Sequence, residues 1–188
     1  MVNQLSGFIA LTLAGAIVLY DGFSKKNGFL GPLNMGLCRG LNLILGMSVL
    51  GVLDNWWYAI IPLVYIFAIT LISRGEVHGN NKNHIIWAGV LYAAVISAVV
   101  TIVMTETTNL WQTVPFLLLF AFLVYKPLIQ AYHLNSPERI KKAVIAGVLA
   151  LIVLDAALAV GFSVWWYGLL LLLLLPLSIF LSKLFAVT

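Results

Sequence analysis

The chain has 188 residues, of which 63% are hydrophobic and 9% are charged, and its formal net charge at pH 7 is +4. A soluble globular domain carries about 25% charged residues, so this composition excludes a water-soluble protein and predicts lipid around most of the chain. The basic residues lie in short loops rather than on one exposed face, which argues against nucleic-acid binding. The single cysteine, Cys38, excludes an intrachain disulfide and a cluster of metal-binding thiolates.

Several segments approach the roughly 20 apolar residues that a helix needs to cross a bilayer. The sequence therefore predicts an all-α, polytopic integral membrane helical bundle of about seven transmembrane helices, forming one domain over residues 1–188. The predicted spans are residues 3–20, 33–53, 57–73, 84–104, 113–132, 138–161 and 165–186.

Prolines mark several of the predicted helix ends. Pro32 and Pro137 occupy positions typical of the first helical residue, and Asn135-Ser136 offers a cap before Pro137. Pro176 lies inside the last predicted helix and is expected to kink it, because proline removes a helical hydrogen bond.

The distribution of charge along the chain predicts its orientation. Every basic residue lies in, or at the membrane edge of, the first, third or fifth loop or beside the C-terminus, and aromatic residues gather at the opposite edge. Because basic loops stay in the cytoplasm, we expect an outside N-terminus and a cytoplasmic C-terminus, in the plasma (inner) membrane. The basic residues are Lys25, Lys26, Arg39, Arg74, Lys82, Lys126, Arg139, Lys141, Lys142 and Lys183, and the aromatic ones are Trp56, Trp57, Tyr58, Trp111, Trp165, Trp166 and Tyr167.

The first polar cluster, at the predicted cytoplasmic end of the first helix, comprises Tyr20, Asp21, Lys25 and Lys26. It fits either a ligand site or ordinary anchoring of the helix end by snorkelling lysines.

A second cluster lies in GPLNMGLCRGLNLILG, residues 31–46, where Asn34, Arg39 and Asn42 enter an apolar, glycine-rich helix. Arg39 and Asn42 are three residues apart and so share a helix face. Arginine can grip a phosphate through two parallel hydrogen bonds, which favours a pocket. The alternative is a helix–helix contact in which the glycines let backbones approach and Arg39 reaches lipid head groups.

A third cluster, ISRGEVHGNNKNH, spans residues 72–84. Arg74 can bind an anion or pair with Glu76, and Glu76 can accept a proton or bind a metal. His78 and His84 lack the close partners of a zinc site. A solvated polar loop is the alternative.

Together, these clusters offer several cations and amides but few carboxylates, an inventory that suits an anion with an apolar tail. We expect Lys25, Arg39 and Arg74 to converge on a polyprenyl diphosphate or a similar lipid phosphate at the cytoplasmic face. Tyr65 is the candidate aromatic face near a developing carbocation, although a core tyrosine is an alternative.

The order of these motifs resembles the UbiA superfamily of prenyltransferases, and looks closest to its EboC-type UbiA-like branch. The resemblance runs from Tyr20-x-x-x-x-Lys25-Lys26 through GPLNMGLCRGLNLILG and ISRGEVHG to DAALAVGF…FAVT, so it covers essentially the whole chain. In that superfamily, a ring of helices encloses a cavity that opens sideways to lipid. Its enzymes transfer a prenyl group from a diphosphate to an aromatic or similar acceptor, with Mg²⁺.

The resemblance implies that Lys25 and Lys26 face the diphosphate and that Arg74 and Glu76 occupy the region of the second Asp-rich motif as catalytic residues. The first motif, NDxxDxxxD, has no counterpart in this sequence. We therefore expect an N-terminally shortened member, a fragment or a gene product missing its front half, with one weak Mg²⁺ site, at Asp21 and Glu76, and little catalysis by this chain alone.

Two other functions stay open. The first is a non-enzymatic membrane subunit that binds a lipid-like metabolite or helps to export it, together with partner proteins. The missing Asp-rich motif motivates this hypothesis, because without it the chain would lack the metal ligands for catalysis. A channel or carrier is less favoured, because the charges stop at one face and no continuous polar path is evident.

Overall fold

The computed structural model describes residues 3–76, 79 and 81–185, with side chains up to Leu181. These residues form helices joined by short turns, without strands in the described ranges, which confirms the predicted all-α polytopic membrane bundle. Six helices are long and apolar enough to cross a membrane, and a shorter apolar stretch spans Trp165–Leu181. Helices are the expected solution, because a lipid-surrounded backbone must satisfy its own hydrogen bonds.

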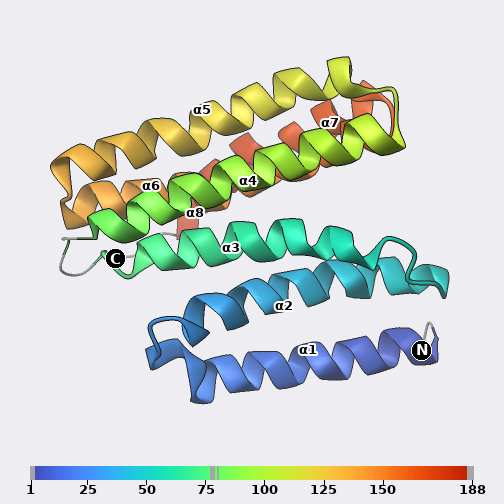
Figure 1. The fold of residues 1–188 in the computed structure, drawn as a ribbon, viewed down its shortest axis with the longest axis horizontal. Helices are drawn as coiled ribbons and strands as arrows, with labels where there is room; N and C mark the ends of the chain where they lie inside the picture. The colour runs from blue at the N-terminus through green and yellow to red at the C-terminus, as the bar shows by residue number, and fades with distance from the viewer. Residues whose placement is uncertain (1–2, 77–78, 80, 186–188) are drawn as a thin grey trace. The chain divides into compact units, whose positions relative to one another are not determined.

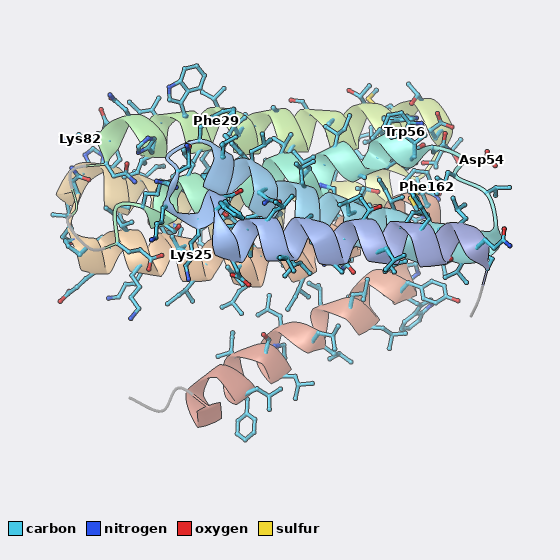
Figure 2. The ribbon with its side chains drawn as sticks, turned by 90° about the horizontal axis from the view of Figure 1, so that it is seen from below. Lys25, Phe29, Asp54, Trp56, Lys82 and Phe162 are labelled. Atoms are coloured by element: carbon cyan, nitrogen blue, oxygen red, sulfur yellow. The ribbon has the colours of Figure 1, made fainter. Side chains whose placement is uncertain are left out.

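Although the sequence predicts one transmembrane domain, the chain divides into two compact units, Met1–Arg74 and Gly75–Thr188. In unit 1, α2 packs against both α1 and α3, and the three helices lie in chain order (Figure 1). Figure 2 places Lys25 at one end of this unit and Asp54 and Trp56 at the other. The elements are α1 (Gln4–Gly22), η1 (Ser24–Lys26), α2 (Leu30–Met47), η2 (Ser48–Leu50), η3 (Trp56–Ala59) and α3 (Ile60–Ser73).

Two glycines bring α2 directly against α3. A Cβ added at Gly36 would lie 2.5 Å from the carbonyl oxygen of Leu63, and one at Gly40 would lie 3.2 Å from that of Ala59. Small residues at these positions therefore let the helix backbones approach closely, as is common in membranes. Of the two readings of the glycine-rich segment, the helix–helix contact accounts for these two glycines.

A small polar network joins the start of α1 to the end of α2. Asn3 Oδ1 accepts a 2.7 Å hydrogen bond from the Ser6 backbone N–H, while Asn3 Nδ2 donates to the Ser48 carbonyl at 2.8 Å. The hydroxyls of Ser6 and Ser48 are 2.8 Å apart. Asn3 thus caps α1 and fixes its register against α2.

In unit 2, α5 and α6 form the most extensive helix pair, α4 packs mainly on α5, and α7 packs on α6. Lys82 and Phe162 lie at opposite ends of this unit (Figure 2). The elements are α4 (Lys82–Glu106), α5 (Leu110–Leu134), α6 (Pro137–Phe162), α7 (Trp165–Leu172) and α8 (Leu174–Phe185).

The prolines meet the predictions to different degrees. Pro137 is the first residue of α6, as expected. Pro32 is the third residue of α2 rather than the first, because α2 already begins at Leu30. The last predicted span breaks at Leu173, which confirms the expected interruption, since Pro176 leaves the carbonyl of Leu172 without its helical N–H donor.

The predicted cap before α6 is realised differently. Ser136 is the N-cap residue, but its side chain makes no capping hydrogen bond. Asn135 instead ends α5 in the left-handed region, with φ 42°, and its Oδ1 accepts a 3.1 Å bond from the Asn81 backbone N–H. The amide therefore joins the α5–α6 turn to the start of α4. Sequence proximity to Pro137 does not reveal this long-range partner.

Candidate functional site

The turn between α1 and α2 presents the first two predicted phosphate-binding lysines. Lys25 and Lys26 belong to the short helix η1, and both side chains are exposed. Asn27 follows them, and its Oδ1 accepts hydrogen bonds from the backbone N–H groups of Phe29 and Leu30, at 3.0 and 3.1 Å. An asparagine in this position satisfies the free donors at a helix start, so α2 begins in a fixed place directly after the lysines.

Arg74, at the end of α3, braces this turn. Its Nη2 donates to the carbonyl oxygen of Asn27. The guanidinium also lies against Gly31, where an added Cβ would be 2.9 Å from Nη2 and 3.0 Å from the carbonyl oxygen of Ser24. Only a glycine leaves this space, so Gly31 serves the arginine rather than a ligand. Arg74 thus places a positive charge beside the backbone that carries Lys25.

A groove of about 610 Å³ runs between α1 and α2. Its walls are apolar for most of their length, and its polar residues include Ser24 and Asn34 at the η1 end. Asn34 Nδ2 donates to Ser24 Oγ at 3.1 Å, and Asn34 Oδ1 lies 3.8 Å from the Cys38 sulfur, which donates to it. The volume lies within the range of about 300–1,000 Å³ typical of small-molecule sites. We call this feature the α1–α2 groove.

The other residues predicted to line a cavity lie elsewhere in unit 1. Asn42 is exposed, Tyr20 is half-buried near the end of α1, and Tyr65 is fully buried within α3. None of them lines the α1–α2 groove, whereas Asn34 does. Of the predicted cavity residues, Asn34 is therefore the one that the structure joins to an apolar hollow.

Arg39 faces a different side of α2 from Asn34. At about 100° of rotation per residue, five residues place the two side chains about 140° apart around the helix. Arg39 is half-buried and does not line the groove. Arg74 contacts the backbone of the η1 turn that carries Lys25, whereas Arg39 lies on another face of α2 from Asn34. The physical reason is helix rotation: three-residue spacing joins Arg39 to Asn42, not to Asn34. The convergence of Lys25, Arg39 and Arg74 on one ligand stays a prediction.

The two carboxylates of unit 1 do not come together at one site. Asp21 is exposed at the end of α1, and the sequence of unit 1 offers one other carboxylate, Asp54, at the opposite end of the unit. Glu76 is half-buried in unit 2. Within the described residues, no three His, Cys, Asp or Glu side chains gather closely enough to hold a metal ion. The donor set of unit 1 thus does not fit a preformed Mg²⁺ site, which needs oxygen ligands in octahedral geometry.

The residues of the third polar cluster have different structural roles, and Thr70 just before the cluster shares one of them. Thr70 and Ser73 donate their hydroxyls to carbonyls of their own helix, those of Ile66 and Thr70, both at 2.8 Å. Such bonds use the hydroxyl protons inside α3. His78 lies outside the described residues.

The start of α4 carries the remaining polar residues of that cluster. His84 Nδ1 contacts the Oδ1 of the buried Asn81, and a polar hollow of about 330 Å³ is lined by Asn81, Lys82, Asn83 and His84. Gly79 has φ 66° and passes so close to the Asn135 carbonyl that an added Cβ would lie 2.8 Å from it. The asparagines and glycines at the start of α4 are therefore explained by a tightly packed turn.

No known protein family, characterised protein or solved structure matches the chain. The site therefore rests on its geometry and on the motif resemblance. Sequence reasoning missed both other polar residues that line the groove, Thr12 and Ser24, although Ser24 stands directly before the lysine pair.

Proposed function

We propose that this membrane protein is a UbiA-like prenyltransferase of the EboC type that binds a polyprenyl diphosphate at the η1 end of the α1–α2 groove. The observation that carries the proposal is the junction of an apolar groove of about 610 Å³ with the turn that presents Lys25 and Lys26. The prenyl chain lies along the groove, and the diphosphate lies at the lysines, beside the half-buried Arg74. Motif order supports the family assignment.

The physical balance favours recognition through the head group. An apolar chain gains little by leaving lipid tails for an equally apolar groove, so the groove supplies shape and the charges supply affinity. Charge-assisted hydrogen bonds from lysine to phosphate are roughly twice as strong as neutral ones. Arg74 positions the turn through its contact with the Asn27 carbonyl and adds a positive charge beside the turn.

In the proposed transfer, a nucleophilic atom of the aromatic or other lipophilic acceptor forms a bond to the first carbon of the prenyl chain. The carbon–oxygen bond to the diphosphate breaks, the diphosphate leaves with the electron pair, and the acceptor then loses a proton. Lys25 and Lys26 stabilise the negative charge that develops on the leaving group. Since the carboxylates of unit 1 do not fit a metal site, no step here is assigned to Mg²⁺.

Photo-crosslinking tests the binding step. The full chain in lipid nanodiscs is labelled with a photoreactive polyprenyl diphosphate analogue, and the labelled peptides are mapped. The double variant Lys25→Gln/Lys26→Gln should lose about tenfold or more of the labelling, because each charged hydrogen bond contributes roughly 1.5–3 kcal/mol.

Two asparagines of α2 provide a matched pair for the groove. Asn34→Leu should lower labelling because Asn34 lines the groove, whereas Asn42→Leu should leave it unchanged because Asn42 is exposed and does not line it. Equal labelling of the wild type and the double lysine variant would refute the site. Equal effects of the two asparagine variants would refute the groove.

The non-enzymatic alternative is motivated by the absence of the first Asp-rich motif from the sequence. It predicts that the purified chain binds the analogue but releases no diphosphate from any prenyl donor, with or without added Mg²⁺. Sustained diphosphate release with formation of a prenylated acceptor eliminates this alternative, and labelling without turnover supports it.

A further inference from the structure

Lys126 occupies an unusual place for a charged residue in a membrane helix. It lies in α5 eight residues before Leu134, the last residue of that helix, which corresponds to about 12 Å along the axis. Its side chain is exposed, and its amine lies 5.0 Å from the centre of the Phe122 ring, one turn further into the apolar part of α5. Charged side chains in the hydrocarbon region are costly and usually serve a partner or a ligand.

Lys126 lines one of two adjoining hollows of unit 2. One, of about 540 Å³, follows α5 beside Lys126 and Gln130, and the other, of about 220 Å³, lies between α4 and α5. They share the lining residues Tyr125 and Ile129, and we call the two adjoining hollows the α4–α5 groove. Tyr125 donates a 2.8 Å hydrogen bond to the Gly89 carbonyl, which fixes the floor of the groove between the two helices.

The end of this groove nearest the α5–α6 turn is positively charged. Arg139 Nη1 donates to Gln130 Oε1 at 3.1 Å, and Lys82 places its amine 5.5 Å from the centre of the Tyr132 ring. Among the described residues that line the two hollows, none carries a carboxylate. The groove therefore joins an apolar channel to three cations without an acidic partner among its lining residues.

We propose that this α4–α5 groove binds an anionic phospholipid of the surrounding bilayer. The phosphate sits at the level of Gln130, where Arg139 already lies and where Lys126, one helical turn deeper, can reach it. One acyl chain follows the groove over Tyr125 and Ile129. Charge complementarity selects this occupant, because the head group of a zwitterionic lipid would bring its own positive charge close to the three cations. The site lies in unit 2 and does not depend on the function proposed for unit 1.

Native mass spectrometry of the full chain tests this proposal, with phosphatidylglycerol and phosphatidylcholine of identical acyl chains as probes. The wild type should retain phosphatidylglycerol in preference to phosphatidylcholine. Lys126→Gln should lower phosphatidylglycerol retention about fivefold, the effect expected of one basic residue near an anionic lipid, without changing phosphatidylcholine. Lys126→Arg should preserve most of the preference.

Lys142→Gln is the matched control, because Lys142 is an exposed lysine near the start of α6 that does not line the groove. A second variant, Ile129→Trp, fills the groove but keeps every charge, so it should also lower retention and remains informative if Lys126→Gln does not fold. Equal retention in Lys126→Gln and wild type, or equal losses in Lys126→Gln and Lys142→Gln, overturns the proposal. The proposal is also overturned if Lys126→Gln abolishes binding of an acidic partner protein and leaves phosphatidylglycerol retention unchanged.

Discussion

The close approach of α2 to α3 at Gly36 gives the sharpest test of unit 1. In Gly36→Ala, the new methyl carbon would lie 2.5 Å from the carbonyl oxygen of Leu63, well inside the 3.4 Å at which ordinary contact begins. Because the obstacle is backbone, no side-chain rotation relieves the clash, and the helices must separate. Overpacking of this kind costs typically about 1–3 kcal/mol.

A graded series on the same helix separates this clash from a general glycine effect. Gly40→Ala would place its methyl carbon 3.2 Å from the Ala59 carbonyl oxygen, a milder contact, and Gly46→Ala would meet nothing within 4 Å. Gly46→Ala should be neutral or stabilising by up to about 1 kcal/mol, because alanine is the better helix former. The expected order of stability is therefore Gly46→Ala, then Gly40→Ala, then Gly36→Ala.

Thermal unfolding of the purified protein in one detergent measures this order, with the fraction of monodisperse protein after heating as the signal. The mutations do not change charge, so differences in detergent binding are small. If Gly36→Ala and Gly46→Ala unfold at the same temperature, α2 and α3 do not meet as described, and the account of the glycine-rich segment fails.

Three further predictions follow from individual contacts. Arg74→Ala should lower the unfolding temperature in the same thermal assay, because the exposed Asn27 carbonyl loses a donor whose net contribution is about 0.5–1.5 kcal/mol; unchanged stability would contradict the bracing role. Tyr125→Phe removes the bond to Gly89 and should cost about 0.6 kcal/mol, the average for hydrogen bonds between membrane helices, measured by equilibrium unfolding in mixed micelles; a stabilised variant would contradict the bond. In a background without the natural cysteine, Asp54→Cys should react with an impermeant maleimide on intact cells and Lys142→Cys only after permeabilisation; the reverse pattern would invert the predicted orientation.

The positions of the helices were largely predictable, because apolar length is a local property of the sequence. The span predicted over residues 84–104 is the helix Lys82–Glu106, and that predicted over 138–161 is Pro137–Phe162. The start of α2 was predicted less well. Pro32 suggested a first helical position, but the Asn27 side chain receives the N–H groups of Phe29 and Leu30 and thereby starts the helix earlier.

The candidate site was predictable only in part. The lysine pair and Asn34 stood out because polar side chains are costly beside lipid. Their sequence spacing did not indicate that Asn34 bonds to Ser24, ten residues away across the turn between α1 and α2. Arg74 was recognised as important, yet its contact with the Asn27 carbonyl joins residues 47 positions apart. Contacts of this range depend on how three helices pack, which no local pattern encodes.

The sequence alone thus determined that this is a helical membrane protein and where its helices run, because hydrophobic length and the cost of buried charge act residue by residue. The tertiary structure decided which polar side chains meet. It joined Arg74 to the backbone of the η1 turn, gave Gly36 to a helix contact and placed Asn34 beside Ser24. These outcomes depend on helix rotation and on backbone approach across distant segments, which are fixed only when the helices pack together.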